Sequence, residues 1–284
     1  MKTSLLIVLG LALVIPHSGF GQRSGNSPSN ANRKNYGSAH SIVSNNDADD
    51  ARQAVDSASV IEAEATLFLL TMEDITTRVK RAQSRPTAEQ VAAYIVAHAS
   101  QNYSPAGCVN ASLNGATTVV LNFNDCTGRR GLRQLTGTLV ETVSVDSGGI
   151  QIRAAASELA VGQTTMDIDS TSVWTNNAGT RSLSVTTSGS GTGALGNTFV
   201  RQGNYIVSWA SDCVTTNGAW SLSSNEGTRS TTAQLTRCSH HCPSGTITRT
   251  HGGRTITISF DGSALAEWSS SDGQSGTVNL VCTP

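Results

Sequence analysis

Residues 104–284 constrain the fold most, because they form a series of short runs rich in Thr, Val and Ile that are separated by turn residues. In "RTITISF" (254–260) the apolar residues Ile256, Ile258 and Phe260 alternate with hydroxyl-bearing ones, which is the period of a half-buried β-strand. No helical pattern lies between the runs, so a parallel α/β sheet is excluded. The sequence therefore predicts a mainly β fold: an antiparallel β-meander of roughly ten or more strands, arranged as a sandwich or an open barrel.

Residues 47–103 have a different pattern, which predicts one long and one shorter α-helix. The segment begins with acidic residues and basic residues follow later, an order that suits the helix dipole. A shorter helix is expected at 87–100, where Thr87 and Gln90 have the spacing of a capping box. We expect the segment to dock on the β domain, and a partner-binding or coiled-coil helix is the alternative. The apolar stripe of the long helix consists of Ile61, Ala65, Phe68, Met72, Ile75 and Val79.

The first residues predict export from the cytoplasm. Residues 1–21 have a lysine, a short apolar run and small residues after it, which is typical of a secretory signal peptide. The run is shorter than the about 20 residues that a membrane span needs, and no second apolar run predicts a transmembrane segment. The first cysteine is Cys108, so no cysteine stands where a lipid anchor would be attached. Residues 22–46 are rich in Ser, Asn and Gly and predict a disordered linker. The expected location is secreted, periplasmic or in the cell envelope.

Composition excludes several classes of ligand. The net charge is −1 and only 14% of the residues are charged, so nucleic acid and anionic membranes are not expected partners. Lys80 is the last lysine, which excludes lysine-dependent chemistry from the β region. The glycines Gly191, Gly193 and Gly196 match G-x-G-x-x-G, but no helix follows them as a dinucleotide site requires. We interpret this stretch as a hairpin loop and predict no cofactor.

The six cysteines all follow residue 107, and in an exported chain they predict three disulfides. Fifteen pairings are possible. The first predicted pair flanks the run at 117–123, the second brackets a hairpin with the turn "NEGT", and the third encloses the last strands. These pairs are Cys108 with Cys126, Cys213 with Cys238, and Cys242 with Cys282.

The stretch "CSHHC" (238–242) offers a competing interpretation as a metal site, completed by His251. A structural zinc site has a second ligand pair downstream, which this chain lacks. In an oxidising compartment the thiols are consumed as disulfides. No metal is therefore predicted, and His240, His241 and His251 are kept as candidates for facing a ligand.

A hydrolase is harder to exclude. The G-x-S-x-G and H-E-x-x-H patterns are absent, so neither a nucleophile elbow nor a zinc protease is indicated. Carboxylate pairs that cleave glycosides can lie far apart in sequence. The available carboxylates include Asp167, Asp169, Glu158 and Glu267. The four tryptophans could stack on sugars, but in a chain with few aromatic residues we expect them in the core.

Two segments carry a family resemblance. They are "EATLFLLTMEDI" (64–75) and "CVNASLNGATTVVLNFNDCTGRRGLRQLTGTL" (108–139). In combination they make the chain similar to a group of β-rich bacterial cell-envelope proteins, described as hypothetical proteins or lipoproteins, that have no established activity. The resemblance implies an envelope location and a β architecture, and it transfers no site residue. The chain departs from the lipoproteins of that group because it lacks their lipid-bearing cysteine.

The expected function is that of a secreted or cell-envelope β-rich protein, non-catalytic, that binds or structures an unknown extracellular or envelope ligand. One alternative is an extracellular hydrolase acting on glycans or peptides. Another is a lipid-binding half-barrel of the envelope, in which the long helix would cover an open apolar face.

Overall fold

The computed structural model describes residues 47–52, 54–55, 58, 85–101, 103–128, 134–177, 180–193, 196–225, 227–239 and 241–280. The predicted signal peptide, the linker and the apolar stripe of the long helix lie outside these residues. The described strands are β1 (Tyr103–Ser104), β2 (Val109–Leu113), β3 (Thr118–Gly128), β4 (Gln134–Asp146), β5 (Gly149–Val161), β6 (Thr164–Asn177), β7 (Thr180–Thr192), β8 (Thr198–Ala210), β9 (Cys213–Ser224), β10 (Gly227–Cys238), β11 (Ser244–His251), β12 (Arg254–Asp261), β13 (Leu265–Ser270) and β14 (Ser275–Asn279).

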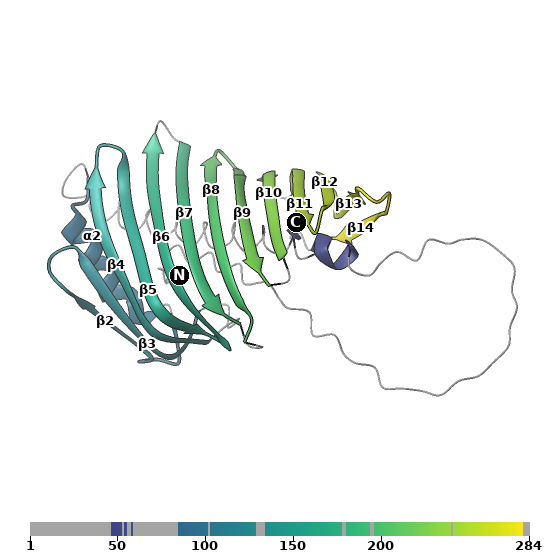
Figure 1. The fold of residues 1–284 in the computed structure, drawn as a ribbon. Coiled ribbons are helices and arrows are strands. Elements are labelled where there is room, and N and C mark those ends of the chain that lie inside the picture. Colours follow the sequence, from purple (N-terminus) through teal and green to yellow (C-terminus); the bar gives the residue numbers. More distant parts are fainter. Residues whose placement is uncertain are drawn as a thin grey trace, which may run out of the picture.

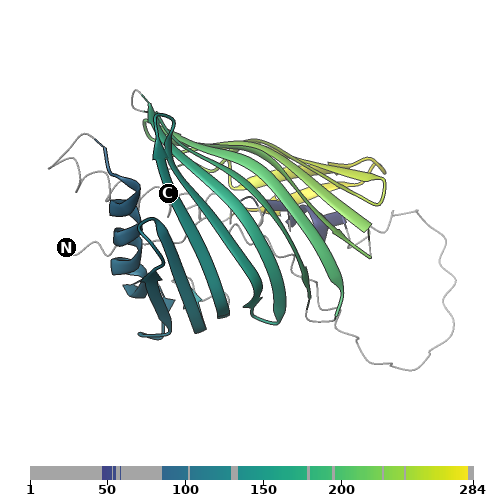
Figure 2. The same cartoon turned by 60° about the vertical axis from the view of Figure 1, so that its left-hand side comes forward.

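These strands form one open antiparallel sheet, in which each strand from β3 to β14 pairs with the next (Figure 1). β1 and β2 both pair with β3. The predicted meander is confirmed, but its strands make a single sheet where a sandwich or an open barrel was expected. The sheet twists and curves strongly along its length (Figure 2), as wide antiparallel sheets do. No described helix is long and apolar enough to cross a membrane.

Two helical segments lie near opposite ends of this sheet (Figures 1 and 2). Residues 47–52 are helical and lie near β11–β14. Helix α2 (Ala88–His98) lies near β2–β4 and continues as a 3₁₀ turn, η1 (Ala99–Gln101). The predicted capping box is confirmed, because the Thr87 amide donates to Gln90 Oε1 at 2.9 Å and the Gln90 amide donates to Thr87 Oγ1 at 3.3 Å.

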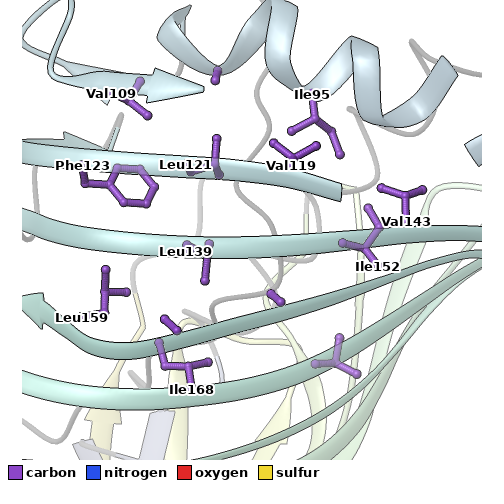
Figure 3. Packing of buried hydrophobic residues seen from close by; sticks show 14 of the residues in the cluster. Ile95, Val109, Val119, Leu121, Phe123, Leu139, Val143, Ile152, Leu159 and Ile168 are labelled. Atoms are coloured by element: carbon purple, nitrogen blue, oxygen red, sulfur yellow. The ribbon is translucent and has the colours of Figure 1, made fainter. Parts of the chain in front are cut away.

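Both helical segments cover the same face of the sheet, which we call the inner face; the opposite face is the outer face. Under α2, Ile95 packs near Val119 and Val143 (Figure 3). At the other end Ala51, Ala54 and Ala58 pack on a second apolar cluster. Strand register joins the two clusters into one surface, because alternate residues of successive strands share a face. The second cluster contains Ala233, Leu235, Ile247, Ile256, Ile258, Phe260, Ala266, Trp268 and Val278.

Ion pairs hold the first helical segment on β11 and β12. Arg249 Nη2 lies 3.3 Å from Asp50 Oδ1, and both side chains are largely buried. Arg254 pairs with Asp47, and its Nε lies 3.0 Å from Asp272 Oδ2. Asp47 and Asp50 therefore bind arginines of the sheet, and they also lie near a helix N-terminus, where a negative charge is favourable.

Candidate functional site

The described cysteines confirm two of the predicted disulfides. Cys108 bonds to Cys126, and Cys213 bonds to Cys238. Cys213 and Cys238 are directly opposite in the β9–β10 ladder, which places their sulfur atoms within reach. Cys242 is also disulfide-bonded; its predicted partner, Cys282, lies outside the described residues.

The candidate histidines do not converge on one site. His241 is exposed before β11, and its amide donates to the Cys238 carbonyl at 3.1 Å. His251 ends β11, and its Nδ1 lies 3.7 Å from Asp50 Oδ2. The strand between them spans roughly 25 Å, so one ligand atom cannot contact both rings. His240 lies outside the described residues.

The metal interpretation of "CSHHC" has no support in the described part of the chain. Cys238 and Cys242 are in disulfides, so neither supplies a thiolate. Within the described ranges no three or more His, Cys, Asp or Glu side chains group as metal ligands would.

The glycine-rich stretch belongs to the β7–β8 hairpin, as predicted. Gly191 lies in β7 opposite Phe199 of β8. A Cβ atom at Gly191 would collide with the carbonyl oxygen of Thr165 on β6, so the glycine permits close approach of the two strands. Gly196 has a φ of 79° in the connection, which suits a turn.

The candidate carboxylates are spread over the sheet. Asp167 and Asp169 share the outer face of β6, whereas Glu267 lies on β13. Arg153 holds Asp169 with two hydrogen bonds, Nε to Oδ1 at 3.1 Å and Nη2 to Oδ2 at 2.7 Å. The hydrogen bonds from Arg153 hold the pKa of Asp169 below its usual value, so this carboxylate is poorly suited to donate a proton.

Glu158 marks an irregularity beside these carboxylates. Its φ is 53°, and the register of β5 against β6 shifts between Ala156 and Leu159, which is a β-bulge. The Glu158 amide donates to Asp167 Oδ1 at 2.9 Å. The bulge therefore fixes Asp167 through the backbone and interrupts the pairing of β5 with β6, which resumes at Leu159 and Met166.

A shallow depression of about 800 Å³ lies on the outer face over β4–β8. Asp167 and Asp169 line the depression together with small or aliphatic side chains. Because these side chains are short, the surface is hollowed at this place. Val200 is 57% exposed there. The other lining side chains include Val140 and Ala155, which are apolar, and Ser188 and Ser190, which carry hydroxyl groups.

Hydroxyl side chains form continuous rows across the outer face. Nine of the twelve members of the threonine row are Thr or Ser, and every member is exposed or half-buried. Neighbouring members lie on adjacent strands, roughly 5 Å apart. The threonine row consists of Thr118, Thr142, Arg153, Thr171, Thr186, Asn204, Ala219, Thr232, Thr248, Thr257, Ser269 and Ser275.

A second row runs beside the first and is similar in character. The only charged members of the two rows are Arg153 and Asp169, and these two form the ion pair described above. The two rows are therefore electrically neutral together, and they present hydroxyl and amide groups. This serine row consists of Asp169, Ser188, Gln202, Ser221, Ser230, Thr250 and Thr255.

The tryptophans lie on the inner face, as expected of core residues. Trp174, Trp209 and Trp268 are each at most 6% exposed, and Trp220 is half-buried against both apolar clusters. None of these four side chains forms an aromatic platform on the outer face.

The inner face carries a feature that was not predicted, a row of buried polar side chains that we call the polar seam. It crosses the sheet from β4 to β13, with apolar or small residues at the positions between. Most members are small hydroxyl residues, which are inexpensive to bury when hydrogen-bonded. The polar seam consists of Glu141, Ser170, Thr187, Thr231, Arg249 and Ser270.

Glu141 is the member whose burial is hardest to explain by packing. Its side chain is fully buried, between Val119 and Ala154 on the adjacent strands. Neither carboxylate oxygen has a hydrogen-bond partner among the described residues. Burial raises the pKa of Glu141 to about 8, because the low-dielectric interior disfavours the charged form. The sequence indicated the burial of Glu141, because it lies two residues from the apolar Leu139 and two from the apolar Val143, on the same face of the strand.

Comparison with known proteins gives no family assignment, because no family model, curated protein or solved structure matches this chain.

Proposed function

We propose that this protein is a secreted or cell-envelope binding protein without catalytic activity, and that the outer face of its sheet is the recognition surface. The observation that carries the proposal is the pair of hydroxyl rows. They stay exposed across the sheet while the apolar side chains of the same strands are buried on the inner face.

The composition of these rows is unusual for a face that only meets water. A solvated sheet surface commonly carries interspersed Lys, Arg, Glu and Asp, which keep it soluble and prevent association. The threonine and serine rows have only the paired Arg153 and Asp169. Hydroxyl groups donate and accept hydrogen bonds, so such rows suit a ligand that is polar and uncharged.

Two further observations support the location and the absence of catalysis. The disulfides Cys108–Cys126 and Cys213–Cys238 are stable in an oxidising compartment. Asp169 is bound by Arg153, and Glu267 is on a distant strand, so neither is well placed as the proton-donating partner of Asp167 that a glycosidase would need. The hydrolase alternative is therefore weaker.

The lipid-binding half-barrel is also weaker. Its ligand would occupy the inner face, but the apolar side chains there, such as Val185, Val207 and Ile247, are completely buried.

Added charge on the threonine row is expected to abolish binding to the cell envelope. Thr186→Arg with Thr232→Arg places two unpaired cations among neutral hydroxyls, which disrupts complementarity to an uncharged ligand. In co-sedimentation with envelopes of the organism that encodes the protein, we expect the apparent affinity to fall about tenfold or more relative to the wild type, a loss of at least about 1.4 kcal/mol.

The matched control adds the same charge elsewhere. Ala93→Arg with Ala97→Arg alters the exposed side of α2 and is expected to leave co-sedimentation unchanged. Equal binding by both double variants would contradict the proposal, and so would release of cleaved products by the wild-type protein.

A further inference from the structure

We propose that the depression over β4–β8 binds a segment of a neutral, hydroxyl-rich glycan chain. This inference rests on the proposed function and deepens it, because it names the ligand class and the part of the outer face that holds it. The depression has a volume of about 800 Å³, within the range of small-molecule sites.

The polar groups of the depression match a polyol. Asp167 Oδ1 is occupied by the Glu158 amide, while no described group hydrogen-bonds its Oδ2 atom, which is left to accept from a sugar hydroxyl. Ser188 and Ser190 lie on the next strand, opposite Asp169 and Asp167. Each serine hydroxyl can donate and accept, so these groups together can satisfy neighbouring hydroxyls of one sugar ring.

The depression also has an apolar part. Val140, Ala155 and Val200 line it, and Val200 is among the most exposed large apolar side chains of the described residues. A sugar ring has C–H groups on its faces and hydroxyls at its rim. An apolar surface beside a few fixed polar groups is the usual composition of a ligand site.

Charge decides which glycans fit. Arg153 and Asp169 neutralise each other through two hydrogen bonds, and this leaves Asp167 as the one unpaired charge among the lining residues. A polyanionic glycan would be repelled by Asp167 and would meet no free cation there. A neutral chain incurs no such penalty.

The structure offers a matched pair of variants to test this site. Val200 and Ile206 are both exposed aliphatic residues on the outer face of β8, but only Val200 lines the depression. Val200→Arg fills the depression with a long charged side chain. Ile206→Arg adds the same group roughly 20 Å further along the strand.

The probes are hexasaccharides of β-1,4-linked glucose, α-1,4-linked glucose and β-1,4-linked N-acetylglucosamine, titrated by calorimetry and by saturation-transfer NMR. We expect at least one to bind the wild type. Val200→Arg should weaken it about tenfold or more, and Asp167→Ala about fivefold, whereas Ile206→Arg should bind like the wild type.

Three results would overturn the inference: no binding of any of the three hexasaccharides, tighter binding of a hexamer of galacturonate, or equal effects of the arginines at 200 and 206. Its failure is distinguishable from failure of the proposed function. If the depression is not the site, Val200→Arg leaves envelope co-sedimentation intact while the Thr186 and Thr232 double variant still abolishes it.

Discussion

Replacing Glu141 with methionine is expected to stabilise the protein at pH 8 and above by on the order of 4 kcal/mol. The side chain is fully buried, and in the part of the chain that the structure describes both carboxylate oxygens lack hydrogen-bond partners. Ionising such a group inside the protein is unfavourable. Methionine has a similar length and places an apolar thioether in the same space.

The effect depends on pH in a definite direction. Folding raises the pKa of Glu141 from its ordinary value of 4.5 to about 8, so between these values the folded protein holds a proton that the unfolded chain has released. Stability linked to this group is therefore fully present below pH 4.5 and is lost as the pH rises toward 8. Below pH 4.5 the methionine variant should differ from the wild type only by the smaller cost of the buried neutral carboxyl.

Urea unfolding at a series of pH values from 4.5 to 8.5 measures this directly. The free energy of unfolding of the wild type should fall relative to that of Glu141→Met across the series. Glu141→Gln, which cannot ionise, should follow the methionine variant in slope, while the exposed Glu267→Gln should follow the wild type. A constant difference between wild type and Glu141→Met would contradict the raised pKa.

Ile258→Ala is expected to cost about 4 kcal/mol of stability. Ile258 is 0% exposed and lies between Ile247 on β11 and Trp268 on β13, so truncation leaves a cavity in the cluster under the first helical segment. Ile206→Ala removes the same atoms from a side chain that is 45% exposed and should change stability by less than about 0.5 kcal/mol.

Urea unfolding of both alanine variants at one pH tests the packing of this cluster. A loss below about 1 kcal/mol for Ile258→Ala, or equal losses for the two variants, would mean that the second apolar cluster is not closely packed.

The strands that alternate clearly could be predicted from sequence. In β12, Ile256, Ile258 and Phe260 are at most 6% exposed, as their spacing predicted. The helix at 88–98 could be predicted because its capping box is local. Both disulfides of the described residues followed from cysteines that bracket a strand or a hairpin.

The arrangement of the strands into one open sheet could not be predicted, because closure depends on curvature. Register shifts in β3 and β5, near Asp125 and Glu158, alter the curvature locally. These residues have positive φ values, and no sequence rule assigns a bulge to an aspartate or a glutamate. Strands β6 and β7 give only a weak strand pattern in the sequence, because they are rich in Ser and Thr and have few long apolar side chains.

The candidate site was predictable only in parts. The shared face of Asp167 and Asp169 follows from their spacing of two residues along one strand. The hydroxyl rows could not be predicted, because they depend on the register of each strand pair. That register is set only in the folded sheet. The inward direction of the Glu141 side chain could be predicted, because Glu141 is two residues from the apolar Leu139 on the same strand. The hydrogen-bonding of its carboxylate could not be predicted, because it depends on which groups pack against it.

Hydroxyl-radical footprinting with mass spectrometry tests most directly whether the outer face is the recognition surface. Val200 and Leu265 report on that face, and Leu113, 45% exposed on the edge strand β2, reports on a surface outside it. With the protein bound to cell envelopes, we predict that oxidation of Val200 and Leu265 falls while that of Leu113 stays at the rate of the free protein. Protection of Leu113 with no change at Val200 and Leu265 would contradict the account.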